Sequence, residues 1–223
     1  MTESRVKKSI LNARVNLIFY FLSLGLSFFS RKIFLENLGA DFIGLSGTLV
    51  NILGFLSLAE MGIGTAVAYN LFKPLQEKDT EKINDIISVL GFLYKKIGIF
   101  IFIAALIISG FLPFIFKETI IPIGIIYFAF FSILFSSLCS YFINYKQILL
   151  TADQKNYLVT KYLQSALLLK TIIQIIIAYT LQNYYLWIAL EIIAATLSCV
   201  LLNWKINKEY TWLKAVSYTH LRA

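Results

Sequence analysis

Charged side chains inside apolar runs are the residues of this chain best suited to chemistry. Glu60, Lys170 and Glu191 each lie within a run long enough to cross a bilayer. A charged residue at the centre of a membrane helix costs roughly 2.5–3.5 kcal/mol on insertion scales unless it faces a partner or water. These three residues are therefore expected to line a polar surface inside a helix bundle or to pair with one another.

Lys170 and Glu191 are candidates for such a pair. Lys170 belongs to a helical stripe of small and polar residues spaced by four, namely Ala166, Lys170, Gln174 and Ala178. A tight turn follows this run, so the next helix is its antiparallel neighbour, and Lys170 and Glu191 differ in depth by about 8 Å. They can pair directly or through water. Two interpretations stay open: a structural ion pair, or the polar lining of a central cavity that holds charges for an anionic cargo.

Glu60 is accompanied by small residues, which occur in pairs spaced by four: Gly62 with Ala66 and Gly64 with Ala68. Small residues at this spacing let another membrane helix approach closely. We therefore expect one long helix over residues 43–71, closely packed on one side and presenting Glu60 on another. The plainer alternative is a structural helix whose Glu60 lies near the lipid headgroups.

No arrangement typical of an enzyme accompanies these charges. The single histidine is His220, and the two cysteines, Cys139 and Cys199, lie in apolar runs, so neither a metal site nor a disulfide framework is predicted. A Walker loop is absent from the sequence. The glycines at residues 62–67 match only part of a dinucleotide fingerprint and lack its βαβ context. We expect no catalytic residues, no metal and no cofactor.

Composition indicates an all-α, polytopic membrane protein. Of 223 residues, 59% are hydrophobic and 14% are charged, with a mean hydropathy of +0.77, whereas a soluble domain has about 25% charged residues. We expect six spans, at about residues 15–29, 43–71, 97–116, 120–145, 158–181 and 184–204. The first span is expected to be a retained helix rather than a cleaved signal peptide. A charge-balanced turn is expected over residues 31–41, and a surface helix over residues 73–96 that runs into the third span.

The net charge of +8 does not indicate nucleic-acid binding, because Lys and Arg lie between the apolar runs, where they orient the spans. Most of them fall on the side of the N-terminus. Only Arg31, Lys32 and Lys117 fall on the other side, while Lys170 lies within a span. The positive-inside rule therefore predicts that both ends are cytoplasmic.

Two sequence blocks are the most specific features of the chain: SLAEMGIGTA at residues 57–66 and LLTADQKNYLV at residues 149–159. With them, residues 9–214 resemble polysaccharide-transport proteins of the Wzx type, the flippases of O-antigen or capsule repeat units. Their superfamily also includes lipid II flippases and multidrug MATE exporters. The resemblance implies two six-helix lobes around a central cavity in the bacterial cytoplasmic membrane. It also implies movement of polyprenyl-pyrophosphate-linked oligosaccharides between the leaflets by alternating access.

The resemblance also bears on the candidate cavity residues. In such proteins basic cavity residues engage the pyrophosphate, and Arg31 and Lys170 match positions where this type often has a basic residue. Glu60, Gln174 and Glu191 complete the candidate substrate-binding set, although Glu191 matches no family pattern.

The chain is short for this family, and we expect it to contain only one lobe. Residues 215–223, AVSYTHLRA, resemble a translated sequencing adaptor and are left out of the fold prediction. We expect an N-terminal lobe over residues 1–214 whose missing partner is the C-terminal lobe, or else a short protein that dimerises. Without the second lobe, the face with Lys170 and Gln174 is expected to be open to lipid. Alternative functions are a MATE-type cation-coupled exporter, a membrane-embedded enzyme of polysaccharide synthesis, which the short outer loops disfavour, or a structural subunit.

Overall fold

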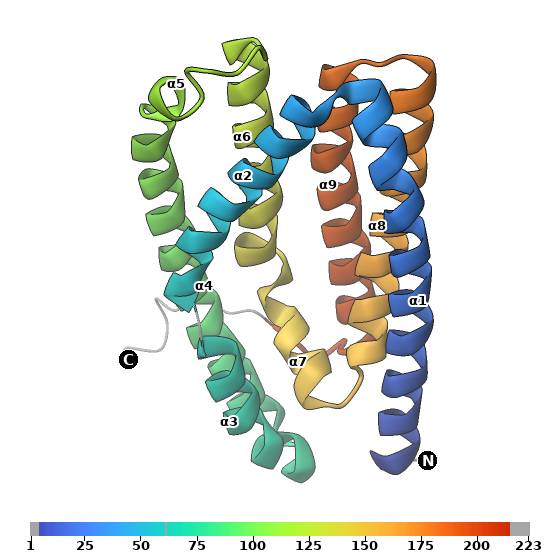
Figure 1. Ribbon diagram of the computed structural model, residues 1–223. Coiled ribbons are helices and arrows are strands. Elements are labelled where there is room, and N and C mark those ends of the chain that lie inside the picture. The colour runs from blue at the N-terminus through green and yellow to red at the C-terminus, as the bar shows by residue number, and fades with distance from the viewer. Residues whose placement is uncertain (1–4, 61, 215–223) are drawn as a thin grey trace.

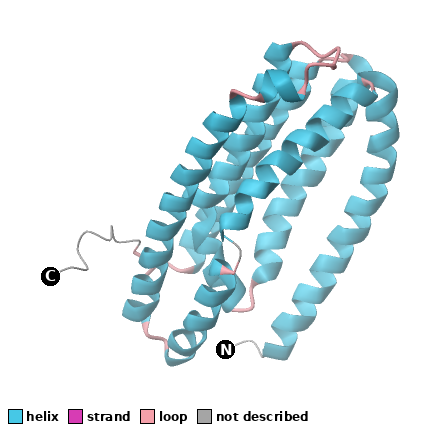
Figure 2. Cartoon of the chain, turned by 60° about the vertical axis from the view of Figure 1, so that its left-hand side comes forward, coloured by secondary structure: helices cyan, strands magenta, loops and turns pink. Residues whose placement is uncertain are grey.

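The computed structural model describes residues 5–60 and 62–214, which form an elongated bundle of helices with no strand (Figures 1 and 2). The helices are α1 (Arg5–Leu38), α2 (Ala40–Leu56), α3 (Ile63–Glu77), α4 (Thr80–Ser109), α5 (Leu112–Ile115), α6 (Ile123–Phe142), α7 (Gln147–Ala152), α8 (Asn156–Thr180) and α9 (Tyr184–Glu209). Five of them, α1, α4, α6, α8 and α9, are long and apolar enough to cross a membrane. The prediction of an all-α, membrane-compatible protein is therefore confirmed. The tail at residues 215–223 lies outside the described residues.

The expected single helix over residues 43–71 is wrong. The structure divides it into α2, a 3₁₀ turn at Ser57–Glu60 and α3, which together run from one end of the bundle to the other in Figure 1. Gly62 immediately precedes α3 with φ of 90°, a left-handed conformation that glycine adopts without a steric penalty. Because Gly62 serves the break, the pair Gly62–Ala66 is not part of one continuous packing stripe.

Gly64 does serve close packing. A Cβ atom at this position would lie 3.6 Å from the Tyr94 hydroxyl and 3.7 Å from the Ile148 side chain. The glycine therefore brings α3 close to α4 and to α7. Of the two small-residue pairs, only Gly64–Ala68 lies wholly within a helix.

The first helix is longer than expected. It covers Arg5–Leu38 rather than residues 15–29, and residues 31–38 of the predicted charge-balanced turn are part of the helix. No proline or glycine occurs between residues 26 and 38, so nothing in the sequence ends the helix before Gly39. The chain turns at Gly39, which has φ of 86°.

The surface helix predicted over residues 73–96 is confirmed in part: residues 80–96 are the N-terminal half of α4 and continue into the third span, whereas residues 73–77 belong to α3. The N-cap of α4 is Asp79, whose side chain accepts a hydrogen bond from the Lys82 backbone N–H at 3.0 Å. Ile83, Ile87 and Leu90 are buried, as their helical spacing predicts.

Two clusters of buried apolar side chains hold the bundle together. The larger one joins α2, α4, α6 and α9 around Phe42 and Phe130, and the smaller one joins α3, α4, α7 and α9 around Leu71 and Leu150. By contrast, α1 packs mainly on α8 and leaves large apolar side chains such as Phe28 exposed. Apolar surface of this extent marks a face that meets lipid or another protein, and together with the five long apolar helices it indicates a bilayer environment.

Candidate functional site

The candidate site is a cavity of about 630 Å³ between α1, α2, α6, α8 and α9. Its wall is mostly apolar, with a row of hydroxyls on α1 from Ser23, Ser27 and Ser30. Lys170, Gln174 and Glu191 also line it. Of the two interpretations of the Lys170–Glu191 pair, the structure supports a cavity lining in which the two charges are also bonded to each other.

The ion pair is direct. The Lys170 Nζ lies 2.8 Å from Oε1 and 2.9 Å from Oε2 of Glu191. Gln174 donates its side-chain N–H to the same Oε1 at 3.2 Å and to the Trp187 carbonyl at 3.1 Å. One carboxylate therefore accepts from two residues of α8, which satisfies the donors that would otherwise be unpaired in an apolar site.

The expectation that the face with Lys170 and Gln174 is open is wrong. The Gln174 residue is 3% exposed, and the Lys170 and Glu191 side chains are 14% and 23% exposed. The reason is that α1 and α9 both pack along α8, and Lys170 and Gln174 bond to residues of α9.

The turn between α8 and α9 sets the register of the pair. Asn183 caps α9 by accepting from the Leu186 backbone N–H at 3.1 Å. On the far side, the Ser136 hydroxyl of α6 donates to the Glu191 carbonyl at 3.2 Å. These bonds fix α9 between α6 and α8, so Glu191 is held at the depth of Lys170.

Aromatic contacts hold α1 and α2 at the rim of the cavity. The Trp187 ring meets Phe34 of α1 edge-on at 5.4 Å and Phe42 of α2 at 5.3 Å between ring centroids. Aromatic pairs in this geometry add about 0.5–1.5 kcal/mol beyond their buried area. The cavity therefore has rigid aromatic packing at one end and the ion pair on its wall.

The structure does not bring Arg31 into this cavity. Its neighbour Ser30 and Phe34, one turn on, line the cavity, but Arg31 is exposed on another face of α1. Arg31 and Lys170 therefore do not form a single basic site.

Glu60 is also outside the cavity lining. It lies in the 3₁₀ turn and interacts with the side chains of Tyr94 and Tyr141. Tyr94 directly precedes Lys95 and Lys96, which begin the apolar half of α4. The structure thus removes Glu60 from the cavity lining, and its depth relative to the lipid headgroups stays a prediction.

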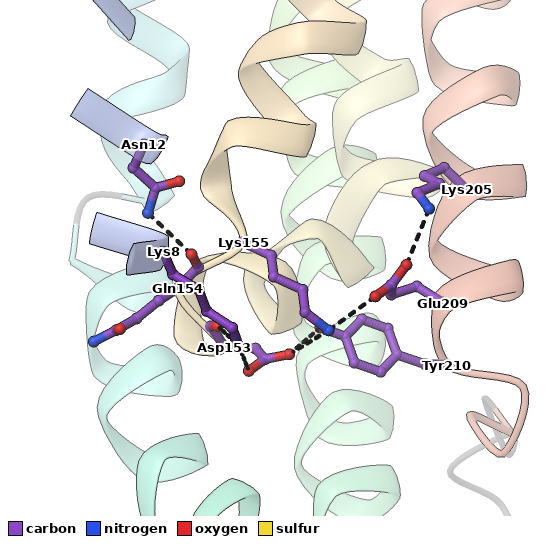
Figure 3. A network of polar contacts seen from close by, with 8 residues as sticks. All are labelled: Lys8, Asn12, Asp153, Gln154, Lys155, Lys205, Glu209 and Tyr210. Atoms are coloured by element: carbon purple, nitrogen blue, oxygen red, sulfur yellow. Dashed lines mark hydrogen bonds and ion pairs between the residues drawn. The ribbon is translucent and has the colours of Figure 1, made fainter. Parts of the chain in front are cut away.

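The most extensive polar network, shown in Figure 3, was not predicted as a site. Asp153 accepts from Lys8 of α1 at 2.9 Å, from Lys155 at 2.8 Å and from the Tyr210 hydroxyl at 2.9 Å. Lys155 also pairs with Glu209 at 2.9 Å. The only sequence signal was the LLTADQKNYLV block, which contains Asp153 and Lys155. The partners lie too far away in sequence for any spacing rule to find them.

Protonation in this network follows from its contacts. Burial raises the pKa of Asp153, but hydrogen bonds from Lys155, Lys8 and Tyr210 outweigh it and hold the pKa below its ordinary value. Burial lowers the pKa of Lys155, yet its bonds to Asp153 and Glu209 raise the pKa above the ordinary value overall. Burial raises the pKa of Tyr210, as does the Asp153 charge, so the phenol stays protonated and donates.

The described residues contain no cluster of three or more His, Cys, Asp or Glu side chains that could hold a metal ion. What the cavity offers is an apolar wall, hydroxyls and one paired lysine. A mostly apolar wall with a few polar groups is typical of a ligand-binding pocket. No protein-family model, curated protein or solved structure matches the chain.

Proposed function

We propose that this chain is one six-span lobe of a flippase that moves polyprenyl-pyrophosphate-linked oligosaccharides across the bacterial cytoplasmic membrane. In this proposal α2 and α3 together form the second crossing, and both ends are cytoplasmic. The observation that carries it is the cavity of about 630 Å³, which combines an apolar wall with Lys170, Gln174 and Glu191 inside the bundle. The resemblance of residues 9–214 to Wzx-type proteins supplies the cargo class.

The cavity wall matches the parts of such a cargo. The apolar side chains of α1 and α2 can contact the isoprenoid chain, and the serines of α1 can hydrogen-bond to sugar hydroxyls. Lys170 supplies a point charge that meets a phosphate without fixed geometry. Because Lys170 is bonded to Glu191, cargo binding requires the lysine to exchange the carboxylate for the pyrophosphate.

Site-specific photocrosslinking tests this proposal. Leu167 lines the cavity, whereas Ile172 on the same helix does not, although the two are similarly exposed, at 41% and 46%. A photoreactive amino acid at residue 167 should capture a radiolabelled polyprenyl-pyrophosphate oligosaccharide in membranes, and the same group at residue 172 should not. Equal capture at both positions, or none at residue 167, contradicts the proposed cargo site.

A cation-coupled exporter of the MATE type is the second candidate, favoured by the presence of Glu191 in the same cavity. In that case Glu191 would bind the coupling cation in exchange for Lys170, which would change the shape of the cavity. Transport by the Glu191→Gln variant should then no longer depend on the gradient of the coupling cation. Capture of the lipid-linked sugar at residue 167 should be no higher than at the control position, residue 172.

A further inference from the structure

A second cavity, of about 850 Å³, lies at the end of the bundle where the chain begins. It is formed by the first turns of α1, the C-terminal half of α3, the start of α4 and the connector between α7 and α8. Among its described lining residues, four lysines, Lys8, Lys73, Lys78 and Lys82, stand against one acid, Asp153. These side chains therefore carry a net charge of +3 at neutral pH.

The acid does not neutralise the exposed lysines. Asp153 is already bonded to Lys8, Lys155 and the Tyr210 hydroxyl. Lys73, Lys78 and Lys82 are all exposed. Lys73 and Glu77 are 3.8 Å apart and both more than half exposed, so this ion pair is weak and does little to neutralise the charge of Lys73. Three cations are thus available to an anion in the cavity.

The position of the cavity indicates the source of that anion. Lys8 lies about 9 Å along α1 from Arg14, where the apolar run begins, so the long lysine side chains reach the headgroup layer. Tyr69 and Phe72, which also line the cavity, are 75% and 48% exposed, with ring centroids 6.2 Å apart. Exposed aromatic residues beside lysines are typical of the membrane–water interface.

We propose that this cavity binds the phosphate of an anionic phospholipid headgroup, with the acyl chains lying along Tyr69 and Phe72. Basic pockets between helices on the cytoplasmic side bind anionic headgroups in this way. The side-chain oxygen of Gln154, on the cavity wall, is buried and has no hydrogen-bond partner among the described residues. It can accept from a headgroup hydroxyl, such as the glycerol of phosphatidylglycerol. This site is separate from the Lys170 cavity and does not depend on the flippase proposal.

Native mass spectrometry of the purified chain with phosphatidylglycerol and phosphatidylcholine of equal acyl length tests the site. The pocket variant replaces Lys73, Lys78 and Lys82 by Gln. The matched control replaces Lys161, Lys208 and Lys214, which are exposed at the same end of the bundle but do not line the cavity. Wild type and control should retain phosphatidylglycerol preferentially, and the pocket variant should lose this preference at least about tenfold. Replacing the three pocket lysines by Arg should preserve it, because the charge remains.

Three results would overturn the proposal. If the pocket and control variants lost the preference for phosphatidylglycerol equally, the lipid would be held by a diffuse attraction to basic residues and not by this cavity. A wild-type chain with no preference for phosphatidylglycerol would mean that no such site exists. Displacement of the lipid by an equal concentration of soluble glycerol phosphate would mean that the cavity binds free phosphate esters rather than a membrane lipid.

Discussion

The Lys8 ammonium of α1 lies 2.9 Å from the carboxylate of Asp153, a residue 145 positions later in the chain. Beside this contact, Asn12 donates to the Gln154 carbonyl at 3.0 Å and accepts from the Tyr157 backbone N–H at 2.6 Å. The first helix is therefore fixed at its N-terminal end by polar contacts to the α7–α8 connector. Because α1 also forms one wall of the candidate cavity, these contacts anchor one end of the helix that carries this wall.

Removing the Asp153 charge should release the N-terminal turns of α1. Asp153→Asn loses charged hydrogen bonds worth about 1.5–3 kcal/mol each, so amide hydrogen exchange in residues 8–16 should accelerate by at least about tenfold at pH 7. Asp85→Asn, at an exposed acid near the same end of the bundle, is the control and should leave exchange unchanged. Unaltered exchange in Asp153→Asn would show that α1 is held by its apolar contacts alone.

The same network predicts a pH dependence. The folded-state pKa of Asp153 lies below the ordinary value of 3.8, so its stabilisation is present above that value and is lost as the pH falls through the folded pKa. The folded-state pKa of Lys155 lies above the ordinary 10.5, so its stabilisation is lost only as the pH rises through that higher value. The stability difference between wild type and Asp153→Asn, measured by thermal unfolding in detergent, should therefore be constant from pH 5 to 9 and shrink below pH 3.8. A difference that disappears near pH 6 would contradict this assignment.

Lys170 variants separate the structural role of the ion pair from cargo binding. Lys170→Ala leaves Glu191 without its bidentate partner and should destabilise the chain by about 1.5–3 kcal/mol. The double variant Lys170→Ala with Glu191→Ala should recover most of this stability but not the crosslinking of lipid-linked oligosaccharide at residue 167. Lys170→Arg should retain part of the crosslinking, since its charge survives. Full recovery of crosslinking by the double variant would show that the pair is structural only.

Gly98 is predicted to be a packing point between α4 and α6. A Cβ atom there would lie 2.8 Å from the Phe142 ring and 3.3 Å from the Tyr141 Cβ. Gly98→Leu should therefore destabilise the bundle by about 1–3 kcal/mol through overpacking, measured by thermal unfolding in detergent. Gly25→Leu on α1, where no atom lies within 4 Å of the added Cβ, should be nearly neutral. Equal effects of the two changes would contradict the close α4–α6 contact.

Membrane topology can be tested by labelling single introduced cysteines with an impermeant reagent. Cys139 and Cys199 are buried, so the unaltered chain should not be labelled and serves as the negative control. With six crossings, Lys78→Cys and Thr151→Cys, both at exposed positions, should be labelled only from the cytoplasmic side and Glu118→Cys only from outside, in keeping with the distribution of basic residues. Labelling of position 118 from the cytoplasm alone would contradict six crossings.

The sequence by itself determined the helical, membrane-compatible character of the chain and the similar depth of Lys170 and Glu191 on neighbouring helices, whereas the direct bond between them came from the structure. Both follow from local rules. Long apolar runs specify helices, and a tight turn between two helices places residues at equal distances from it side by side. The buried pattern of Ile83, Ile87 and Leu90 was predictable for the same reason, because helical periodicity is a property of neighbouring residues.

Only the tertiary structure decided where the chain breaks and which distant charges meet. Gly62 could have continued a helix, and only the structure shows that its backbone is left-handed and precedes α3. Arg31 faces away from the cavity because the rotation of α1 is set by its contacts with α8. The Lys8–Asp153 pair joins residues whose separation carries no periodic signal, so only the folded arrangement of α1, the connector and α9 brings their charges together.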